Sequence, residues 1–202
     1  MLELGYLIVG AFLLGSIPFA YLLVRLLFRV DVRAHGSGNP GATNASRVFP
    51  KRWRLGGFLL IFALDAGKGY AACALLPAWF ERTHGSQADW VPAACGLAAV
   101  LGHSFSPFLK FRGGKGVATT LGVLIALEPI ATLLALAVFG VIWAATRIVS
   151  LGSIAMAVVL PVAIYWRGEA PPAVGLMAIL LGVLIIVRHR SNIGRLIRGT
   201  ET

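Results

Sequence analysis

Charged side chains are scarce in this sequence, and acidic ones are the scarcest. Of 202 residues, 8 are Asp or Glu and 18 are Lys or Arg, so that charged residues make up 13% of the chain. A soluble domain usually has about a quarter. Apolar residues make up 58% and the mean hydropathy is +0.83. This composition excludes the ordinary soluble classes and indicates a protein embedded in a lipid bilayer.

Cysteine and aspartate are also too few for the common metal sites. Cys73 and Cys95 lie in apolar segments without companions at ligand spacing, so we expect two buried thiols that pack as small hydrophobic side chains. A phospho-alcohol transferase that uses Mg²⁺ would need several clustered aspartates. Only Asp31 and Asp65 fall on the basic side of the chain. We therefore expect no metal and no cofactor.

Seven apolar segments dominate the chain. They cover residues 4–24, 57–80, 91–102, 116–127, 130–146, 151–166 and 172–187. Several are shorter than the roughly 20 residues that cross a bilayer core. The expected fold class is an all-α integral membrane protein with seven transmembrane helices and some short or re-entrant segments at the cytoplasmic face. No internal repeat or linker divides residues 1–202, so we expect a single domain, and a monomer.

Basic residues fall in alternate connections between these segments. They are Arg25, Arg29, Arg33, Arg47, Lys51, Arg52, Arg54, Lys110, Arg112, Lys115, Arg147, Arg188, Arg190, Arg195 and Arg198. The positive-inside rule then predicts an outer N-terminus on an uncleaved first helix and a cytoplasmic C-terminus. Nucleic acid is not an expected partner, although the net charge is +10, because no soluble domain presents these charges on one face.

The stretch HGSGNPGATN, residues 35–44, contains G-x-G-x-x-G but lacks the preceding strand and the later acidic residue of a dinucleotide fold. Glycines let backbone N–H groups approach an anion, and short polar side chains add donors. We expect anion binding here; the alternative is a solvated turn that caps the next helix. The candidate residues are Ser37, Gly38, Asn39, Gly41, Thr43, Asn44 and Arg47.

The stretch FRGGKG, residues 111–116, resembles a P-loop but lacks the Ser or Thr that should follow its lysine. It leads into a short apolar helix, whose N-terminus would attract an anion. We expect the loop to dip into the membrane and line a polar cavity. Anchoring at the interface is the alternative, and we accept it for Lys110. The candidate residues are Arg112, Gly113, Gly114, Lys115 and Gly116.

Two further pairs of residues contain charged or titratable side chains. Asp65 and Lys68 lie three residues apart within an apolar segment, where charges must pair, so we expect a structural ion pair, with direct catalysis as the alternative. His189 and Asn192 end the last segment among arginines. Arginine neighbours should lower the pKa of His189 and leave a neutral base; an interfacial histidine without function is the alternative.

The sequence also contains the H-x-x-x-x-D spacing of the acyl-thioester acyltransferases, from His84 to Asp89. These residues fall in a short connection on the outer side, away from every basic motif. Four other connections, at 35–47, 102–116, 147–153 and 187–195, would meet at one membrane face if the helices form a bundle. We therefore interpret the H-x-x-x-x-D match as coincidence and expect the site among these four connections.

Six motifs, in order along nearly the whole chain, resemble a known family. They are GSIPFAYL at 15–22, GSGNPGATN at 36–44, DAGKG at 65–69, GHSFSPFLKFRGGKGVAT at 102–119, SLGS at 150–153 and RHRSNI at 188–193. Together they are similar to the bacterial acyl-phosphate:glycerol-3-phosphate acyltransferases. The resemblance implies a multi-pass enzyme of phospholipid biosynthesis in the bacterial cytoplasmic (inner) membrane, with its active site facing the cytoplasm.

The reaction that the resemblance implies moves an acyl group from acyl phosphate to the sn-1 hydroxyl of glycerol 3-phosphate. The products are lysophosphatidic acid and phosphate. Acyl phosphate is already activated, and the sequence offers no serine–histidine–acid triad or activated cysteine, so we expect direct transfer without an acyl-enzyme. Positioning and electrostatics would then supply most of the catalysis. The expected partners are these two substrates and membrane lipid.

The resemblance also implies roles for particular residues. Glycerol 3-phosphate would be held by Ser37, Arg47, Lys115, His189 and Asn192, and the glycine-rich backbone at 36–41 and 113–116 would cradle the phosphate of the donor. Ser150, in the SLGS motif, is a further binding candidate. Ser37 and His189 are the catalytic candidates, with either His189 or the leaving phosphate as the base. A transporter of a phosphorylated solute is the competing class, although no inverted repeat is visible.

Overall fold

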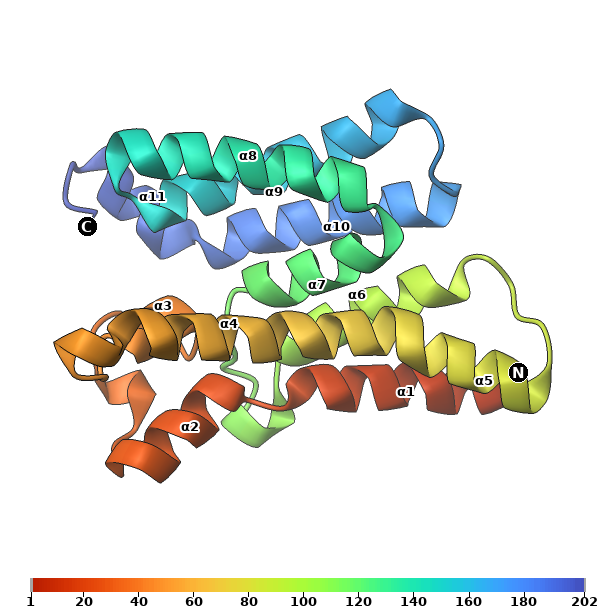
Figure 1. The fold of residues 1–202 in the computed structure, drawn as a ribbon, viewed down its shortest axis with the longest axis horizontal. Coiled ribbons are helices and arrows are strands. Elements are labelled where there is room, and N and C mark those ends of the chain that lie inside the picture. The colour runs from red at the N-terminus through yellow and green to blue at the C-terminus, as the bar shows by residue number, and fades with distance from the viewer. Residues whose placement is uncertain (1, 202) are drawn as a thin grey trace.

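The structure is a computed structural model that describes residues 2–201. In this part of the chain eleven α-helices, joined by short turns, make up the fold, and no β-strand occurs (Figure 1). The helices are α1 (Leu2–Ser16), α2 (Phe19–Phe28), α3 (Ala42–Ser46), α4 (Arg54–Tyr70), α5 (Leu76–His84), α6 (Val91–Ser104), α7 (Val117–Leu127), α8 (Pro129–Thr146), α9 (Val149–Arg167), α10 (Pro172–Arg188) and α11 (Arg190–Ile197). The predicted all-α class is confirmed.

Five helical segments among residues 2–201 are long and apolar enough to cross a membrane. They are Leu2–Phe28, Lys51–His84, Val91–Leu109, Pro129–Thr146 and Val149–Arg167. A sixth is reached if α10 and α11, which meet at a bend of 57°, form one broken span. A helical membrane protein with five or six candidate spans is therefore confirmed, and the count of seven transmembrane helices stays a prediction.

The segment outside this count is α7, which is too short to cross. It has 11 residues, about 16 Å at the α-helical rise, whereas the hydrocarbon core is about 30 Å thick. The connection before it turns through a 3₁₀ helix, Pro107–Leu109, and two residues with positive φ, Lys110 and Phe111. A half-length helix preceded by a compact turn is the geometry that the short apolar run 116–127 predicted.

The first apolar segment contains a break that its composition did not reveal. α1 ends at Ser16 and α2 begins at Phe19, because Pro18 has no N–H and disfavours helix in the residue before it. The carbonyl oxygen of Ile17 accepts hydrogen bonds from the backbone N–H of Phe19 at 3.2 Å and from Nζ of Lys68 at 2.7 Å. A backbone acceptor released by a break in lipid needs such a partner.

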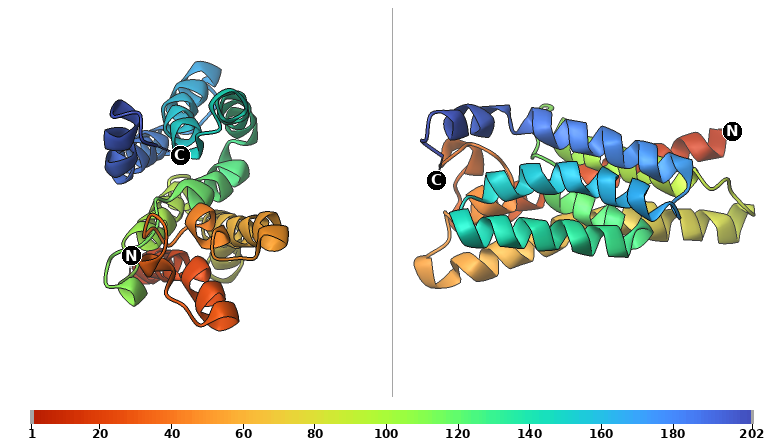
Figure 2. Two further views of the ribbon diagram at one scale, coloured as in Figure 1. Left: turned by 90° about the vertical axis from the view of Figure 1, so that its left-hand side faces the viewer. Right: turned by 90° about the horizontal axis from the view of Figure 1, so that it is seen from above.

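The helices form two layers with α7 between them (Figure 1). α1, α2, α4 and α6 lie in one layer, α8, α9 and α10 in the other, and the long helices of both run lengthwise along the molecule (Figure 2). α7 packs against both α4 and α8. Gly122 of α7 makes the close approach possible, since an added Cβ would lie 1.8 Å from the carbonyl oxygen of Ala66.

Several connections that are far apart in the sequence gather at one end of the molecule. Figure 1 places α2, α3 and α11 at one end and the start of α1 at the other. Segments that are far apart in the sequence, the 35–47 loop and the chain after α10, lie at the same end (Figure 1, Figure 2). This is the convergence of basic connections that the sequence predicted. The single-domain organisation stays a prediction.

Candidate active site

A cavity of about 580 Å³ opens between the two layers at the end that carries α3 and α11. Its walls come from the 35–47 loop, from α4, α7, α8 and α9, and from the segment after α10. Eleven of the predicted binding residues line it: Ser37, Asn39, Gly41, Thr43, Asn44, Arg47, Lys115, Gly116, Ser150, His189 and Asn192. Four distant connections therefore share one chamber.

Asn44 organises the 35–47 loop. Its buried side chain donates from Nδ2 to the carbonyl oxygens of Val32 (3.1 Å) and His35 (2.9 Å), and its Oδ1 accepts from the N–H of Ser37 at 2.9 Å. The N–H of Gly38 donates to His35 as well. The side chain of Asn44 and the N–H groups of Ser37 and Gly38 therefore hold the loop in shape, and substrate binding by Asn44 and by the backbone at 36–41 stays a prediction.

The glycine turn before α7 is also bonded to the protein. The N–H groups of Gly113 and Gly114 donate to the carbonyl oxygens of Ser104 and His103, both at 3.1 Å. A Cβ on Gly114 would lie 2.1 Å from Nε2 of His103. These glycines allow tight packing, and their N–H groups are bonded within the protein. Neither glycine lines the cavity, and exposed Arg112 lies outside it too, as does Gly38.

Arg188 holds the same turn from the opposite layer. Its Nη2 donates to the carbonyl oxygen of Gly113 at 2.6 Å, and its Nε donates to that of Gly114 at 3.2 Å. The turn is therefore fixed between α6 and the end of α10. The next residue, Lys115, lines the cavity, where its Nζ donates to Oδ1 of Asn192 at 2.5 Å.

Lys115 is a cation in a partly buried position, outside the spans. Burial lowers the pKa of Lys115 to about 8; Glu201 opposes this shift, and Arg195 adds to it. The ammonium group is thus mostly protonated at neutral pH and can be neutralised by mild alkali. An anion that replaced its neutral partners would stabilise the charged form.

His189, the residue after α10, is 2% exposed. Its Nδ1 lies 2.8 Å from the carbonyl oxygen of Ile185. Because a carbonyl only accepts, Nδ1 carries the proton, and Nε2 of the neutral ring keeps a lone pair. Burial, followed by the charge of Lys115, lowers the pKa of His189 to about 4. The direction is the one expected from the arginines, but burial and Lys115 cause it.

Glu201 ties the C-terminal segment into the cavity, and sequence reasoning missed it. Its Oε1 accepts from Oγ of Ser150 (2.7 Å) and Nδ2 of Asn192 (2.5 Å), and its Oε2 accepts from Nε of Arg195 (2.5 Å). Burial opposes its ionisation, but the three hydrogen bonds prevail and lower the pKa of Glu201. The residue lies outside every motif, so only the fold reveals it. The other polar lining residues that were not candidates are His103, Arg147, Ser153, Arg195 and Thr200.

The intramembrane pair lies beside the cavity. Nζ of Lys68 is 2.8 Å from Oδ1 of Asp65, with side chains 1% and 3% exposed, and Nδ1 of His103 lies 3.6 Å from the same oxygen. Asp65 and His103 line the cavity, whereas Lys68 reaches back to Ile17. The pair therefore links α4 to the break after α1 and borders the chamber.

The rest of the cavity wall is apolar. Phe58 and Phe62 contribute from α4, with ring centroids 5.7 Å apart, and Leu136 and Phe139 contribute from α8. Figure 1 shows α4 and α8 on either side of α7. A chamber with a polar, cationic end and an apolar side suits an amphipathic ligand with an anionic head.

The described residues offer no cluster of metal ligands, and the two residues of the H-x-x-x-x-D match lie away from the cavity. Within residues 2–201, no three His, Cys, Asp or Glu side chains are placed to hold a metal ion. Cys73 and Cys95 are free, buried thiols. His84 ends α5 and stacks on Phe80 at 4.4 Å. Neither His84 nor Asp89 lines the cavity.

Five or six apolar spans, together with a chamber that is cationic at one end and apolar along one side, define a helical membrane protein with a site for an amphipathic anion. Known proteins narrow this class. The chain belongs to the glycerol-3-phosphate acyltransferase family, whose sequence profile matches residues 5–199. The family that the six motifs resemble is thereby confirmed.

Named relatives cover almost the whole chain. A glycerol-3-phosphate acyltransferase of Trichlorobacter lovleyi is 46% identical over 195 residues, which are 96% of this chain and 94% of the relative. One from Halalkalibacterium halodurans is 42% identical over 207 residues, which are 99% of this chain and 95% of the relative.

The fold matches solved structures of the same kind. The glycerol 3-phosphate form of PlsY (YgiH), described as an integral membrane glycerol 3-phosphate acyltransferase, superposes with a TM-score of 0.85 at 40% identity. The match covers 99% of this chain and 94% of that one. The lysophosphatidic acid form gives a TM-score of 0.82 at 38% identity, with the same coverage.

Proposed function

We propose that the protein transfers an acyl group from acyl phosphate to the sn-1 hydroxyl of glycerol 3-phosphate, forming lysophosphatidic acid and phosphate. The observation that carries the proposal is the cavity, which joins a cationic polar end to an apolar side between α4 and α8. Membership of the family, and the glycerol 3-phosphate and lysophosphatidic acid forms of its relative, support it.

The polar end would hold glycerol 3-phosphate. Arg47 and Lys115 supply cations from the two sides of the chamber, and Ser37 and Asn192 supply neutral hydrogen-bonding groups. The bond from Lys115 to Asn192 shows that the two side chains already face one point. A phosphate placed there would gain charge-assisted hydrogen bonds, which are about twice as strong as neutral ones.

The apolar side would hold the acyl chain of the donor, with its carbonyl carbon next to the glycerol hydroxyl. In a direct transfer a bond forms between that hydroxyl oxygen and the acyl carbon, while the bond from the acyl carbon to the phosphate oxygen breaks. The hydroxyl proton passes to Nε2 of neutral His189 or to an oxygen of the departing phosphate. The lone pair that the Ile185 contact leaves on Nε2 supports the first route.

In this proposal, the orientation of the protein in the membrane follows from the distribution of its basic residues. The basic end, with the cavity, would face the cytoplasm from the bacterial inner membrane. The start of α1 would lie outside, and seven membrane-embedded segments would result if α7 is counted as a half-crossing. The chain would act as a monomer, without metal, since every proposed group belongs to one cavity of one chain.

The test measures formation of lysophosphatidic acid by purified protein in lipid mesophase with glycerol 3-phosphate, because this product is common to both donors, whereas only acyl phosphate releases phosphate. Palmitoyl phosphate and palmitoyl-CoA are compared as donors, for the wild type, His189→Ala and Ser37→Ala. We expect product from palmitoyl phosphate alone. His189→Ala should lose at least about a hundredfold of the activity, as for removal of a general base. Ser37→Ala should also lose activity, because a hydrogen-bonding group for glycerol 3-phosphate is removed.

His84→Ala is the matched control, because this histidine lies at the opposite end and does not line the cavity. It should keep wild-type activity. Equal turnover of both donors would refute the acyl phosphate assignment. Absence of turnover, combined with movement of glycerol 3-phosphate across sealed vesicles, would favour transport.

A further inference from the structure

A second basic region lies outside the cavity, on the surface of the polar end. It consists of Arg25 and Arg29 at the end of α2, and of Lys51, Arg52 and Arg54 at the start of α4. All five residues are exposed, and none of them lines the cavity. We call it the basic surface. The proposed reaction makes no use of it.

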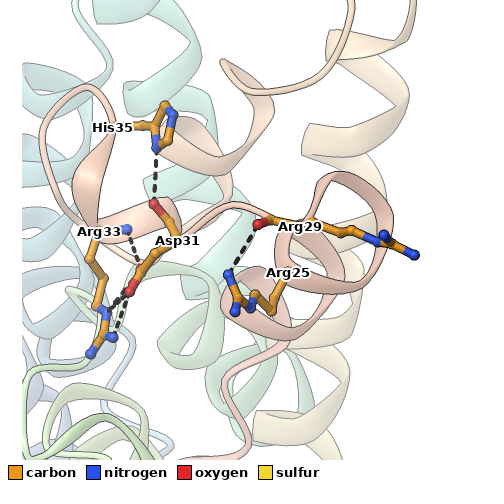
Figure 3. Close-up of polar contacts among 5 residues, drawn as sticks. All are labelled: Arg25, Arg29, Asp31, Arg33 and His35. Carbon is orange, nitrogen blue, oxygen red and sulfur yellow. Dashed lines mark hydrogen bonds and ion pairs between the residues drawn. The ribbon is translucent and has the colours of Figure 1, made fainter.

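The charges of the basic surface are not neutralised nearby. Asp31 is the one acidic residue between positions 25 and 54, and Arg33 occupies both of its oxygens, at 2.7 to 3.2 Å. This contact lowers the pKa of Asp31 and keeps it ionised. Figure 3 shows Arg33 folded onto Asp31, whereas the guanidinium group of Arg29 extends away from both.

Packing brings the two parts of the basic surface together. The rings of Phe28 and Phe49 meet edge to face at 4.8 Å, which places the end of α2 beside the segment that begins α4. Arg29 has φ of +58° and ends α2, and its carbonyl oxygen accepts from Nη1 of Arg25 at 3.0 Å (Figure 3). The chain therefore turns directly after α2 and leaves both guanidinium groups outside.

Large apolar side chains are interspersed among these cations. Leu26 is 77% exposed, Trp53 is 60% exposed and Leu55 is 69% exposed, whereas Ala20 and Val24 face the protein on the inner side of α2. A soluble acidic protein or a nucleic acid would leave the apolar residues in water. A surface that alternates cations with Leu and Trp fits the boundary between lipid headgroups and acyl chains.

We infer that the basic surface binds acidic phospholipid headgroups. These lipids belong to the leaflet on the same side of the membrane as the polar end of the molecule, where the cavity lies. Arg25, Arg29, Arg52 and Arg54 would contact the lipid phosphates, while Leu26, Trp53 and Leu55 lie among the upper acyl chain carbons. Each basic residue near an acidic membrane surface gains an electrostatic attraction to it. Neutral zwitterionic lipids would bind the same apolar residues without this gain.

The basic surface is continuous with the loop that lines the cavity. Between them, Nδ1 of His35 bonds the carbonyl oxygen of Asp31 at 2.9 Å (Figure 3), and Asn44 bonds the carbonyl oxygens of Val32 and His35. Acidic lipid held by Arg29 would therefore steady the backbone that presents Ser37 and Arg47. This second part rests on the proposed function and predicts a lower KM for glycerol 3-phosphate in acidic bilayers.

Binding is tested without substrate. Protein in mild detergent is titrated with dioctanoyl phosphatidylglycerol or dioctanoyl phosphatidylcholine, and bound lipid is counted by native mass spectrometry. We expect the wild type to prefer phosphatidylglycerol at least tenfold. Arg52→Gln/Arg54→Gln should lose most of that preference, because two of the cations that attract the acidic headgroup are removed. Arg25→Gln/Arg29→Gln should do the same.

Arg82→Gln, on the exposed end of α5 at the other end of the molecule, is the matched control and should keep the full preference. Equal binding of both lipids by the wild type, or an unchanged preference in both double variants, would overturn the inference. In nanodiscs, the KM for glycerol 3-phosphate should fall with added phosphatidylglycerol in the wild type and in Arg82→Gln, but not in the two double variants. Lipid preference without acyl transfer would count against the proposed function and leave the lipid site standing.

Discussion

Five polar side chains of the cavity are bonded to one another. Lys115 donates to Asn192, Asn192 donates to Glu201, and Glu201 also accepts from Ser150 and Arg195. Such a network fixes the positions of its members before any ligand arrives. A phosphate that enters must replace some of these contacts, so that part of its binding energy is offset by the bonds it breaks.

The activity should depend on pH most clearly through the charge of Lys115. Since its pKa is lowered to about 8, the free protein loses this charge as the pH rises through that value, and kcat/KM for glycerol 3-phosphate should fall with it. Lys115→Arg should retain its charge and shift the alkaline limb above pH 10. A pH profile between 5 and 10 tests this.

Lys110→Arg, an exposed change in the same connection, should keep the wild-type profile. His189, whose pKa is about 4, should add no acid limb above about pH 5. An identical alkaline limb in Lys115→Arg would show that another group titrates.

At the scale of elements, the turn before α7 shows what sequence patterns can and cannot predict. The short apolar run correctly indicated a half-length helix, and the positive charge of Lys115 correctly placed it at a cavity. That Gly113 and Gly114 bind a phosphate stays a prediction, because a glycine needed for close packing against His103 looks the same in a sequence as one that exposes its N–H to a phosphate. Only the partners of those N–H groups separate the two.

Arg188 should act on catalysis through this turn. Arg188→Gln removes two hydrogen bonds from a charged donor, each worth about 1.5–3 kcal/mol, so Lys115 would no longer be held towards Asn192. We expect KM for glycerol 3-phosphate to rise at least about tenfold, with a smaller change in kcat, in steady-state kinetics.

Arg190→Gln, an exposed neighbour, is the control and should behave as the wild type. Arg188→Lys should recover part of the loss, since one ammonium can reach one carbonyl. An Arg188→Gln protein with unchanged KM but a lower melting temperature would indicate a purely structural role.

At the scale of the molecule, the arrangement in two layers carries the function. The sequence predicted that four connections meet at one face, because alternation of charge between apolar segments is readable without a structure. The sequence did not predict which helices would lie on opposite sides of the cavity. α7 lies close against α4 because Gly122 has no Cβ to meet the carbonyl oxygen of Ala66, and a contact of this kind depends on pairing between distant residues. Glu201 was missed for the same reason.

A larger side chain in the apolar wall of the cavity, between α4 and α8, should slow the reaction of a long-chain acyl donor more than that of a short-chain donor. Leu136 is a half-buried residue of α8 that lines the cavity, and Leu136→Trp would fill part of the apolar side. We expect kcat/KM for palmitoyl phosphate to fall about tenfold more than that for butyryl phosphate, since about 1.4 kcal/mol corresponds to that factor.

Leu133→Trp is the matched control, because Leu133 is 64% exposed on the same helix and does not line the cavity. Its ratio between the two donors should match the wild type. A parallel loss with both donors in Leu136→Trp would place the acyl chain elsewhere.

The break at Pro18 also has a consequence for how the chain is assembled. Lys68 supplies its bond to the Ile17 carbonyl oxygen from a position 51 residues later in the sequence. During synthesis, the first helix therefore enters the membrane before the residue that completes its hydrogen bonding has been made. Lys68 itself has to enter together with Asp65, its partner at 2.8 Å. The break at Pro18 is thus completed only when α4 has been made, and α6, against which α1 packs most extensively, follows later still.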